Sequence, residues 1–193
     1  DTGFVRARGA VVLQAPELEG LLSGDSLFFD LEQEVGWIEG SSSLRRSVDE
    51  GDELILETTG LRFDLARSVL IGTGGFRVRA EGVAVQAERG VYEADSARVL
   101  VAGGVILNQR SSAQNYHTRM EADSMVVSLS HNRVEQVAIM GRVLGQIEAS
   151  GRQSWVAGRG GRILLVDGNL DQVEIDAEAD VTYRDSTEEE VSR

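Results

Sequence analysis

Residues 24–40 read GDSLFFDLEQEVGWIEG, and this stretch decides which fold the chain can adopt. A small polar turn comes first, then an apolar run, a charged turn, a second apolar run and a closing Gly. Apolar and polar residues alternate within each run, which is the pattern of a half-buried β-strand. The stretch therefore predicts two antiparallel strands joined by the charged turn.

The same unit recurs along the chain. The first apolar run of the unit begins near residues 27, 61, 91, 125 and 163, so successive copies lie about 30 to 38 residues apart. Each copy has a second alternating run, at residues 35–40, 69–72, 99–103, 137–141 and 173–177. A single unit of this size cannot bury its own apolar face, so neighbouring units have to stack. The repeat predicts one elongated body with a continuous apolar interior.

A period of two assigns one face of these runs to the interior. The positions predicted to line it are Leu27, Phe29, Val35, Trp37, Leu61, Phe63, Val69, Ile71, Val99, Val101, Met125, Val127, Val137, Ile139, Ile163 and Leu165. Core packing is the favoured role for both tryptophans, Trp37 and Trp155, over stacking on a sugar. A sealed core and a ligand groove are equally compatible with this periodicity.

The segments between the runs add further strands, for example around Val83–Val85 and Val105–Leu107. We expect strands of four to eight residues and an all-β fold. Two polar segments, 41–53 and 108–119, are predicted to be long loops. The expected organisation is a single domain over residues 1–183 and a disordered acidic tail over 184–193.

Composition limits the possible functions. The net charge is −13, and every basic side chain that is not His is Arg, so the chain has no cationic excess with which to bind nucleic acid or an anionic membrane surface. The absence of Cys excludes disulfides, thiolate metal sites and Cys nucleophiles. No apolar run approaches the roughly 20 residues of a transmembrane helix. The chain starts at Asp1 without a signal peptide, which does not assign it to the cytoplasm.

Motifs for catalysis are scarce. The only histidines, His117 and His131, fall in predicted loops or turns, and no nucleophile motif is present. The Gly-rich segments 72–75 and 158–161 are not followed by a predicted helix, so they do not indicate phosphate loops. The acidic segments 49–53 and 176–180 lack the ligand spacing of a calcium loop and are interpreted as solvated charge. We expect no catalytic site, no metal and no cofactor.

The repeated pattern resembles the OstA-like domain of the lipopolysaccharide-transport proteins. The best matches are Gly24-Asp25-Ser26-Leu27 with Trp37-Ile38-Glu39-Gly40, and Ala122-Asp123-Ser124-Met125 with Ile139-Met140-Gly141-Arg142-Val143. Ala102-Gly103-Gly104-Val105-Ile106-Leu107 is similar to the Gly-x-Val-x-Leu strands of that family. The similarity extends from about residue 5 to 182 and is one of repeats rather than of a fixed motif.

This resemblance implies a folded-over antiparallel β-jellyroll built from repeated strand pairs, whose interior shields the acyl chains of lipopolysaccharide or a similar glycolipid in the periplasm. It also implies partners that add a strand to each open sheet edge, either other β-jellyroll proteins of the transport bridge or further copies in a head-to-tail oligomer. Shielding acyl chains from water contributes about 25 cal/mol per Å² of apolar surface. The net charge of −13 requires Arg residues near the groove mouth to compensate an anionic lipid.

Two other classes of protein fit the same sequence pattern. A structural β-solenoid, such as a scaffold or an adhesin segment, would have the same periodicity with a sealed core and no ligand. A carbohydrate-active enzyme on a β-helix would need two carboxylates facing one cleft. Sequence alone does not choose between the soluble, the anchored and the excised-domain type of transport component, nor does it identify the lipid.

Overall fold

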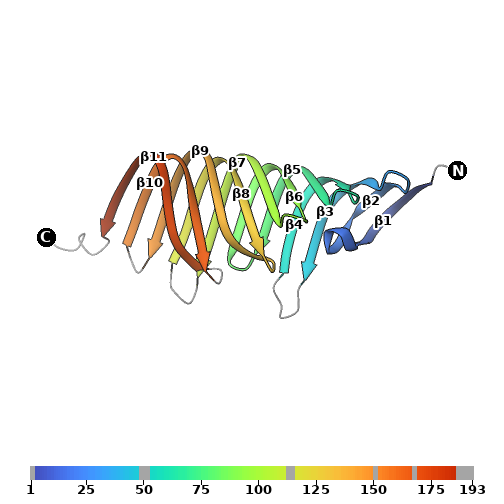
Figure 1. The fold of residues 1–193 in the computed structure, drawn as a ribbon, viewed down its shortest axis with the longest axis horizontal. Coiled ribbons are helices and arrows are strands. Elements are labelled where there is room, and N and C mark those ends of the chain that lie inside the picture. Colours follow the sequence, from blue (N-terminus) through green and yellow to red (C-terminus); the bar gives the residue numbers. More distant parts are fainter. Residues whose placement is uncertain (1–2, 48–52, 112–115, 150–151, 167–168, 186–193) are drawn as a thin grey trace.

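The computed structural model describes residues 3–47, 53–111, 116–149, 152–166 and 169–185. These residues form one antiparallel sheet and a single 3-10 turn at Pro16–Leu18 (Figure 1). The strands are β1 Phe4–Ala15, β2 Gly20–Asp30, β3 Val35–Ser47, β4 Glu53–Asp64, β5 Val69–Ala80, β6 Val83–Glu93, β7 Arg98–Ser111, β8 Tyr116–Ser130, β9 Arg133–Ala149, β10 Arg152–Val166 and β11 Asn169–Asp185.

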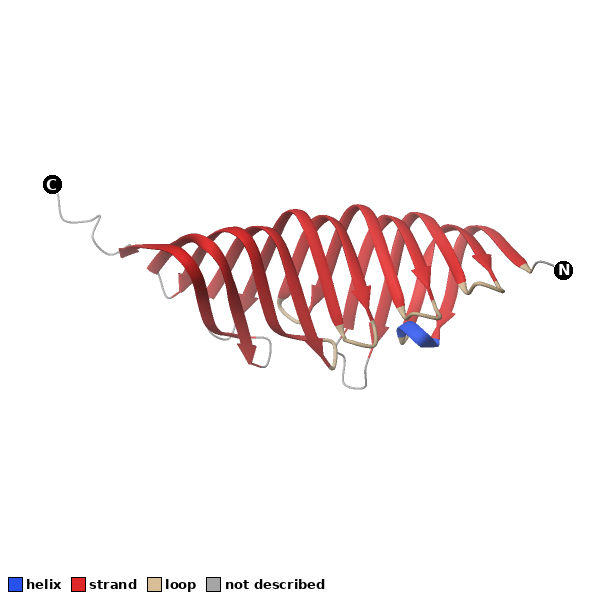
Figure 2. Ribbon diagram, turned by 45° about the horizontal axis from the view of Figure 1, so that its top comes forward, coloured by secondary structure: helices blue, strands red, loops and turns tan. Residues whose placement is uncertain are grey.

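The strands follow each other in sequence order across the sheet, from β1 to β11. Within the described part of the chain, β1 and β11 each pair with only one neighbour, so the sheet is not closed. Figure 2 shows this sheet bent over into an elongated body, with the two edge strands at opposite ends. The predicted all-β, folded-over antiparallel architecture is confirmed. Among the described residues, no helix is long and apolar enough to cross a membrane.

A line of pairing irregularities runs across the middle of the sheet. Between β3 and β4, for example, the register skips from Glu39 paired with Gly60 to Ser42 paired with Thr58. Comparable skips interrupt all ten strand pairs. A β-bulge bends its strand and increases the local twist, so a row of bulges bends the whole sheet. We call this row the crease and the two halves of the sheet the two panels.

The crease explains why the predicted strand length of four to eight residues is wrong. The strands contain 11 to 17 residues because each strand continues through the crease, so that a run of the repeat and the adjoining linking segment, such as 99–103 and 105–107 in β7, form one strand. In β4 the buried apolar side chains are Leu54 and Leu56 before the bend, and Leu61 and Phe63 after it. The bulge shifts the alternation by one residue, which makes one long strand read as two short ones.

The predicted loops are also largely strand. Residues 41–47 continue β3, and residues 108–111 and 116–119 belong to β7 and β8. These segments are polar because only one face of each panel is buried, so that their outward side chains are exposed, and because some of their residues lie at the crease. The remaining parts of the two predicted loops, residues 48–52 and 112–115, lie outside the described residues. Arg184 and Asp185 belong to β11, so the strand extends beyond the predicted domain end at 183, and the predicted tail from 186 onward lies outside the described residues.

Candidate lipid-binding interior

The inner faces of the two panels form one apolar interior that runs along the body. Cross-strand partners share a face, so the pairing register identifies continuous inner rows. One row joins Tyr92, Val99, Val127, Val137 and Ile163 across β6 to β10. All five side chains are buried and belong to a single apolar cluster. Burying side chains of this size contributes about 1.5–3 kcal/mol each, so the interior is the main source of stability.

Twelve of the sixteen predicted lining residues lie on this inner face. Eleven are buried in the cluster, namely Leu27, Leu61, Phe63, Val99, Val101, Met125, Val127, Val137, Ile139, Ile163 and Leu165. Phe29 is partly buried against the cluster, with its ring centroid 5.5 Å from that of Phe63.

The other four predicted lining residues were assigned to the wrong face. Trp37 and Ile71 are 44% and 40% exposed on the outer face. Val35 and Val69 are half-buried at the starts of β3 and β5, where each is paired with Asp64. The period of two holds within one strand, but it does not determine which face a residue occupies after the next turn. The assignment was therefore wrong for the second strand of these two hairpins.

The turn between β2 and β3 shows the physical reason. Asp30 pairs with Val35, and its carboxylate accepts hydrogen bonds from the backbone N–H of Glu32 at 2.9 Å and of Gln33 at 3.1 Å. This register places Ile38, not Trp37, opposite Leu27. Turn geometry fixes hairpin register, and a shift of one residue moves every side chain to the other face. Trp155 is half-buried beside the inward Val156, so the expected core role of the tryptophans is wrong for Trp37 and only partly met by Trp155.

All sixteen predicted lining residues lie on one panel, so no lining residue was predicted for the other, second panel, although strands were predicted there around Val83–Val85 and Val105–Leu107. The inner face of this second panel consists of buried apolar side chains, which include Leu22, Leu44, Leu56, Phe76, Val78, Val85, Leu107 and Met120. The ring of Phe76 lies where Cβ atoms at Gly72 and Gly90 would otherwise be, so the two panels interlock. The alternation Leu54-Ile55-Leu56 was a usable signal for this panel, but it falls beside a segment that was interpreted as a loop.

The free margins of the two panels are joined by polar contacts. On one margin, Arg46 at the end of β3 donates hydrogen bonds to the Tyr92 hydroxyl and to the Glu19 carboxylate. The amide of Asn132, in the turn after β8, donates to the backbone carbonyl of Arg46 at 3.3 Å. Further along, Arg133 forms an ion pair with Glu81 at 3.1 Å. These contacts close the margins over the apolar interior.

Burial raises the pKa of the Tyr92 hydroxyl above its ordinary value, and the charge and hydrogen bond of Arg46 oppose this shift only in part.

Near the ends of β7 and β8, polar side chains are buried within the interior. Gln109 and Thr118 are paired across the two strands and are both fully buried. The Gln109 amide donates to the Tyr116 hydroxyl at 3.0 Å, and this hydroxyl accepts a hydrogen bond from the backbone N–H of Leu170 on β11. The Thr118 hydroxyl has no hydrogen-bond partner among the described residues.

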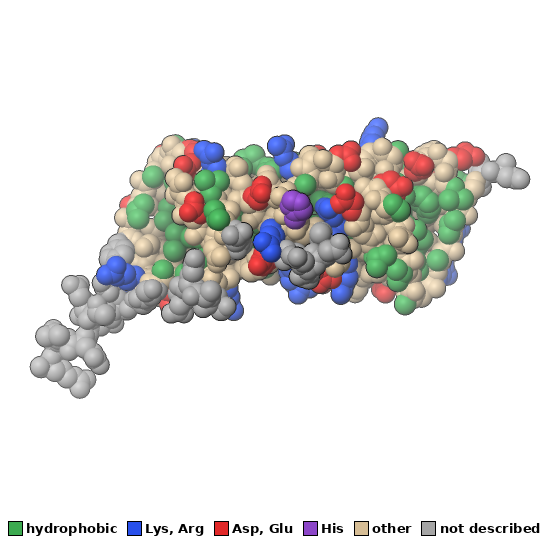
Figure 3. Space-filling view, turned by 60° about the horizontal axis from the view of Figure 1, so that its bottom comes forward, with side chains coloured by type: hydrophobic (Ala, Val, Ile, Leu, Met, Phe, Trp, Pro, Cys, Tyr) green, Lys and Arg blue, Asp and Glu red, His purple; other side chains and the backbone are tan. Residues whose placement is uncertain are grey.

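The outer face carries an aromatic cluster near the β1 edge. Phe28 stacks on Trp37 with ring centroids 4.1 Å apart, and Phe4 lies 5.3 Å from Phe28. The Arg6 guanidinium lies over the Phe28 ring at 5.2 Å. Elsewhere acidic and basic side chains are interspersed, as Figure 3 shows for one face. The aromatic cluster was not predicted, because Phe28 and Trp37 come together only through the register of β2 and β3.

The described residues contain no group of three or more His, Asp or Glu side chains that could hold a metal ion. His131 lies in the turn between β8 and β9, as predicted, whereas His117 belongs to strand β8 rather than to a loop. Of the predicted acidic clusters, residues 49–52 are outside the described part, and residues 176–180 lie in β11.

Comparisons with known proteins support the fold alone. No family model matches the chain, and no curated protein sequence matches it. A solved structure does match, that of LptH, described as the LptA-homologous periplasmic component of the lipopolysaccharide transport device of Pseudomonas aeruginosa. The two chains are 10% identical, with a TM-score of 0.52 over 67% of this chain and 93% of LptH. This chain therefore has an LptA-like fold.

Proposed function

We propose that this protein is a periplasmic component of lipopolysaccharide transport, which shields the lipid A acyl chains on their way to the outer membrane. The observation that carries the proposal is the apolar inner face, which continues across an unclosed, folded-over sheet from β2 to β10. A track of this kind suits a long apolar ligand that must move, whereas a single pocket suits a ligand that stays. The similarity in fold to LptH supports the same function.

Lipid entry requires the two panels to separate. Phe63, Leu70 and Tyr92 are fully buried in the interior, so acyl chains have to displace contacts between the panels. Among the described residues, the margins are joined by polar contacts of Arg46 with Tyr92 and Asn132 and by the ion pair of Arg133 with Glu81. Exchanging contacts between panels for contacts with acyl chains keeps the apolar surface away from water and therefore costs little hydrophobic free energy. The two panels then separate by rotating about the crease.

The sheet edges suit strand addition by neighbouring proteins in the periplasm. Within the described residues, β1 and β11 have unpaired outer edges, and such edges accept a further strand through backbone hydrogen bonds. Partners of the same fold would extend the apolar interior from one protein to the next. Another copy of this chain is one such partner, in a head-to-tail oligomer.

Adjacent residues on opposite faces of β8 provide the test. A photo-crosslinking amino acid at Met125, which is buried in the interior, should form an adduct with lipopolysaccharide, and the same amino acid at the outward Val126 should not. Phe63→Asp should abolish the adduct at Met125, whereas Ile71→Asp on the outer face should leave it unchanged. Circular dichroism establishes that each variant is folded.

The packed interior also favours a second candidate, a structural scaffold with a sealed core. In that case no inner position forms a lipid adduct in the folded protein, and the purified chain still assembles end to end. Equal adducts at Met125 and Val126 would contradict shielding, because both faces would then meet lipid alike.

A further inference from the structure

Every second hairpin, from that of β2 and β3 to that of β10 and β11, places a glycine with positive φ at the crease against a polar side chain of the paired strand. In four of these five hairpins that side chain is acidic, and the pairs are Gly40 with Asp25, Gly103 with Glu88, Gly141 with Asp123, and Gly160 with Asp176. The carboxylates take part in the bend, since Asp123 accepts a hydrogen bond from the backbone N–H of Arg142 at 2.9 Å. Acidic side chains at these positions are thus part of the repeat itself.

The hairpin of β4 and β5 departs from this pattern. Its glycine, Gly74, lies against Thr59, which is neutral. The Thr59 hydroxyl donates to the carbonyl oxygen of Gly74 at 2.8 Å, so it joins the two strands without adding a negative charge. A Cβ at the adjacent Gly75 would meet nothing within 4 Å, so the space beside it is open.

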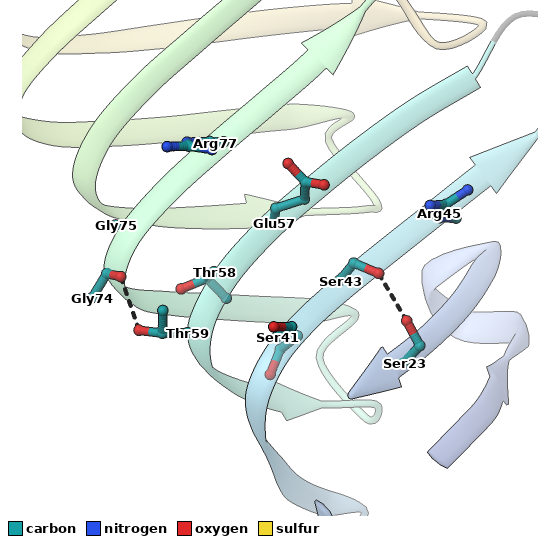
Figure 4. A pocket seen from close by; sticks show the side chains of 11 residues that line it. Ser23, Ser41, Ser43, Arg45, Glu57, Thr58, Thr59, Gly74, Gly75 and Arg77 are labelled. Atoms are coloured by element: carbon teal, nitrogen blue, oxygen red, sulfur yellow. Dashed lines mark hydrogen bonds between the residues drawn. The ribbon is translucent and has the colours of Figure 1, made fainter. Parts of the chain in front are cut away.

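A polar hollow of 560 Å³ opens on the outer face at this hairpin (Figure 4). Its lining comes from four successive strands, β2 to β5, and consists of Ser23, Ser41, Ser42, Ser43, Arg45, Glu57, Thr58, Thr59, Gly74, Gly75 and Arg77. Arg45, Glu57 and Arg77 point outward, because each alternates with a buried inner residue of its strand. No apolar side chain is among the lining residues, and the volume lies within the range of small-molecule sites.

The hydrogen bonds inside the hollow determine what it can offer a ligand. Thr58 donates to the carbonyl oxygen of Thr73 at 2.6 Å, and Ser42 donates to that of Ile38 at 3.1 Å. The hydroxyl protons of Thr58, Thr59 and Ser42 are therefore used within the protein, and their oxygens remain as acceptors. Acceptors arranged in this way suit a ligand with several hydroxyl groups.

The charged side chains add a preference for an anion. Arg77 has no ion-pair partner among the described residues, and Arg45 has a distant one, Glu53 at 3.7 Å. Glu57 is neutralised by Arg79 at 2.6 Å. Guanidinium groups bind phosphate and carboxylate through two parallel hydrogen bonds. In a chain with a net charge of −13, this hollow has one Arg that is unpaired among the described residues and one loosely paired Arg, and its hairpin glycine lies against the neutral Thr59 rather than an acidic side chain.

We propose that the hollow binds an anionic saccharide, in which sugar hydroxyls donate to the Ser and Thr oxygens and a phosphate or carboxylate group is held by Arg77 and Arg45. The site is on the outer face, so it does not depend on the proposed acyl-chain track. A second crease hollow of 320 Å³ provides the internal comparison. It keeps its acidic residue, Asp123, and is lined partly by apolar side chains such as Val105 and Leu144, so it lacks both features of the proposed site.

The test is a titration of the ¹⁵N-labelled full chain with glucose 6-phosphate, followed by NMR. We expect saturable shifts of the backbone amides at Ser41, Thr59 and Gly75, and at least about tenfold weaker binding of glucose and of inorganic phosphate, each of which supplies only half of the contacts. Thr59→Asp introduces the acidic residue type of the other hairpins, so it should fold and lose at least about tenfold in affinity. Arg77→Gln should lose affinity to a similar degree, whereas Arg98→Gln, at an exposed position on β7, should not.

The proposal is overturned if Thr59→Asp and Arg77→Gln bind glucose 6-phosphate like the unmodified chain, or if phosphate alone binds as tightly. A detergent-dispersed glycolipid with a phosphorylated sugar head distinguishes the source of the ligand. Binding of this glycolipid that depends on Thr59 and Arg77 identifies a lipid head group, and binding of the soluble sugar phosphate alone identifies a free saccharide; both outcomes support the site. Crosslinking at Met125 is read out separately, so failure of the acyl-chain track and failure of this site are distinguishable.

Discussion

Arg46 and Tyr92 are 46 positions apart in sequence, and the guanidinium of the first donates a hydrogen bond to the hydroxyl of the second across the closed margin of the folded sheet. The guanidinium also lies 5.9 Å from the centre of the Tyr92 ring. Its side chain is only 12% exposed, and Glu19 supplies the neutralising charge. The three residues come from β3, from β6 and from the turn after β1, so this one contact ties together distant parts of the sheet.

Removal of the Tyr92 hydroxyl should loosen this margin. Tyr92→Phe keeps the buried ring but deprives Arg46 of an acceptor, and a hydrogen bond to a charged group contributes about 1.5–3 kcal/mol. We expect urea unfolding to show a loss of that order. Under the proposed function, the photo-crosslinking yield at Met125 should rise because the panels separate more easily. A yield that is unchanged despite the lower stability would show that lipid does not enter at this margin.

The raised pKa of Tyr92 predicts a loss of stability at high pH. The unfolded hydroxyl titrates near its ordinary pKa of 10.0, whereas burial holds the folded-state pKa higher. The folded state therefore keeps the proton over a range in which the unfolded state releases it. The stabilisation is complete below the unfolded pKa and is lost as the pH rises through the folded pKa. The free energy of unfolding measured upward from pH 10 should decline less steeply in Tyr92→Phe than in the unmodified chain.

Thr118→Val should stabilise the protein. The hydroxyl is fully buried and has no hydrogen-bond partner among the described residues, and an unsatisfied buried hydroxyl costs about 1–3 kcal/mol. Valine has nearly the same shape, so it removes this cost without leaving a cavity. Thermal unfolding should show a higher Tm. A lower Tm would mean that the hydroxyl has a partner, and Thr118→Ser, which keeps the hydroxyl, distinguishes this from a loss of packing.

Neighbouring residues on β5 test the register directly. Leu70 is fully buried and Ile71 is 40% exposed, although the period-two reading of the sequence placed Ile71 inside. Leu70→Ala should cost about 2–5 kcal/mol in the free energy of unfolding, because it leaves a cavity in the interior. Ile71→Ala should cost far less, within the range of about 0.5 kcal/mol that is usual for surface positions. Equal costs would contradict the register observed between β4 and β5.

The sequence alone was enough to assign several residues to the inner face. Val99, Val101, Met125, Val127, Val137 and Ile139 were assigned to the inner face correctly, because each pair lies within one strand segment. Trp37 and Ile71 were assigned wrongly, because their positions depended on the turns before Val35 and Val69. The polar hollow was not found at all, since its residues come from four strands and acquire a common surface only at the crease.

The sequence by itself determined the repeat, the antiparallel all-β fold and the apolar character of the interior, because alternation and glycine spacing are local properties of the chain. The tertiary structure decided the rest. Hairpin turns selected the face on which Ile38 and Trp37 lie, and bulges at the crease joined short runs into long strands. Closure of the margins brought Arg46 to Tyr92. These outcomes depend on register and bending, where a shift of one residue exchanges the inner and outer faces of a strand.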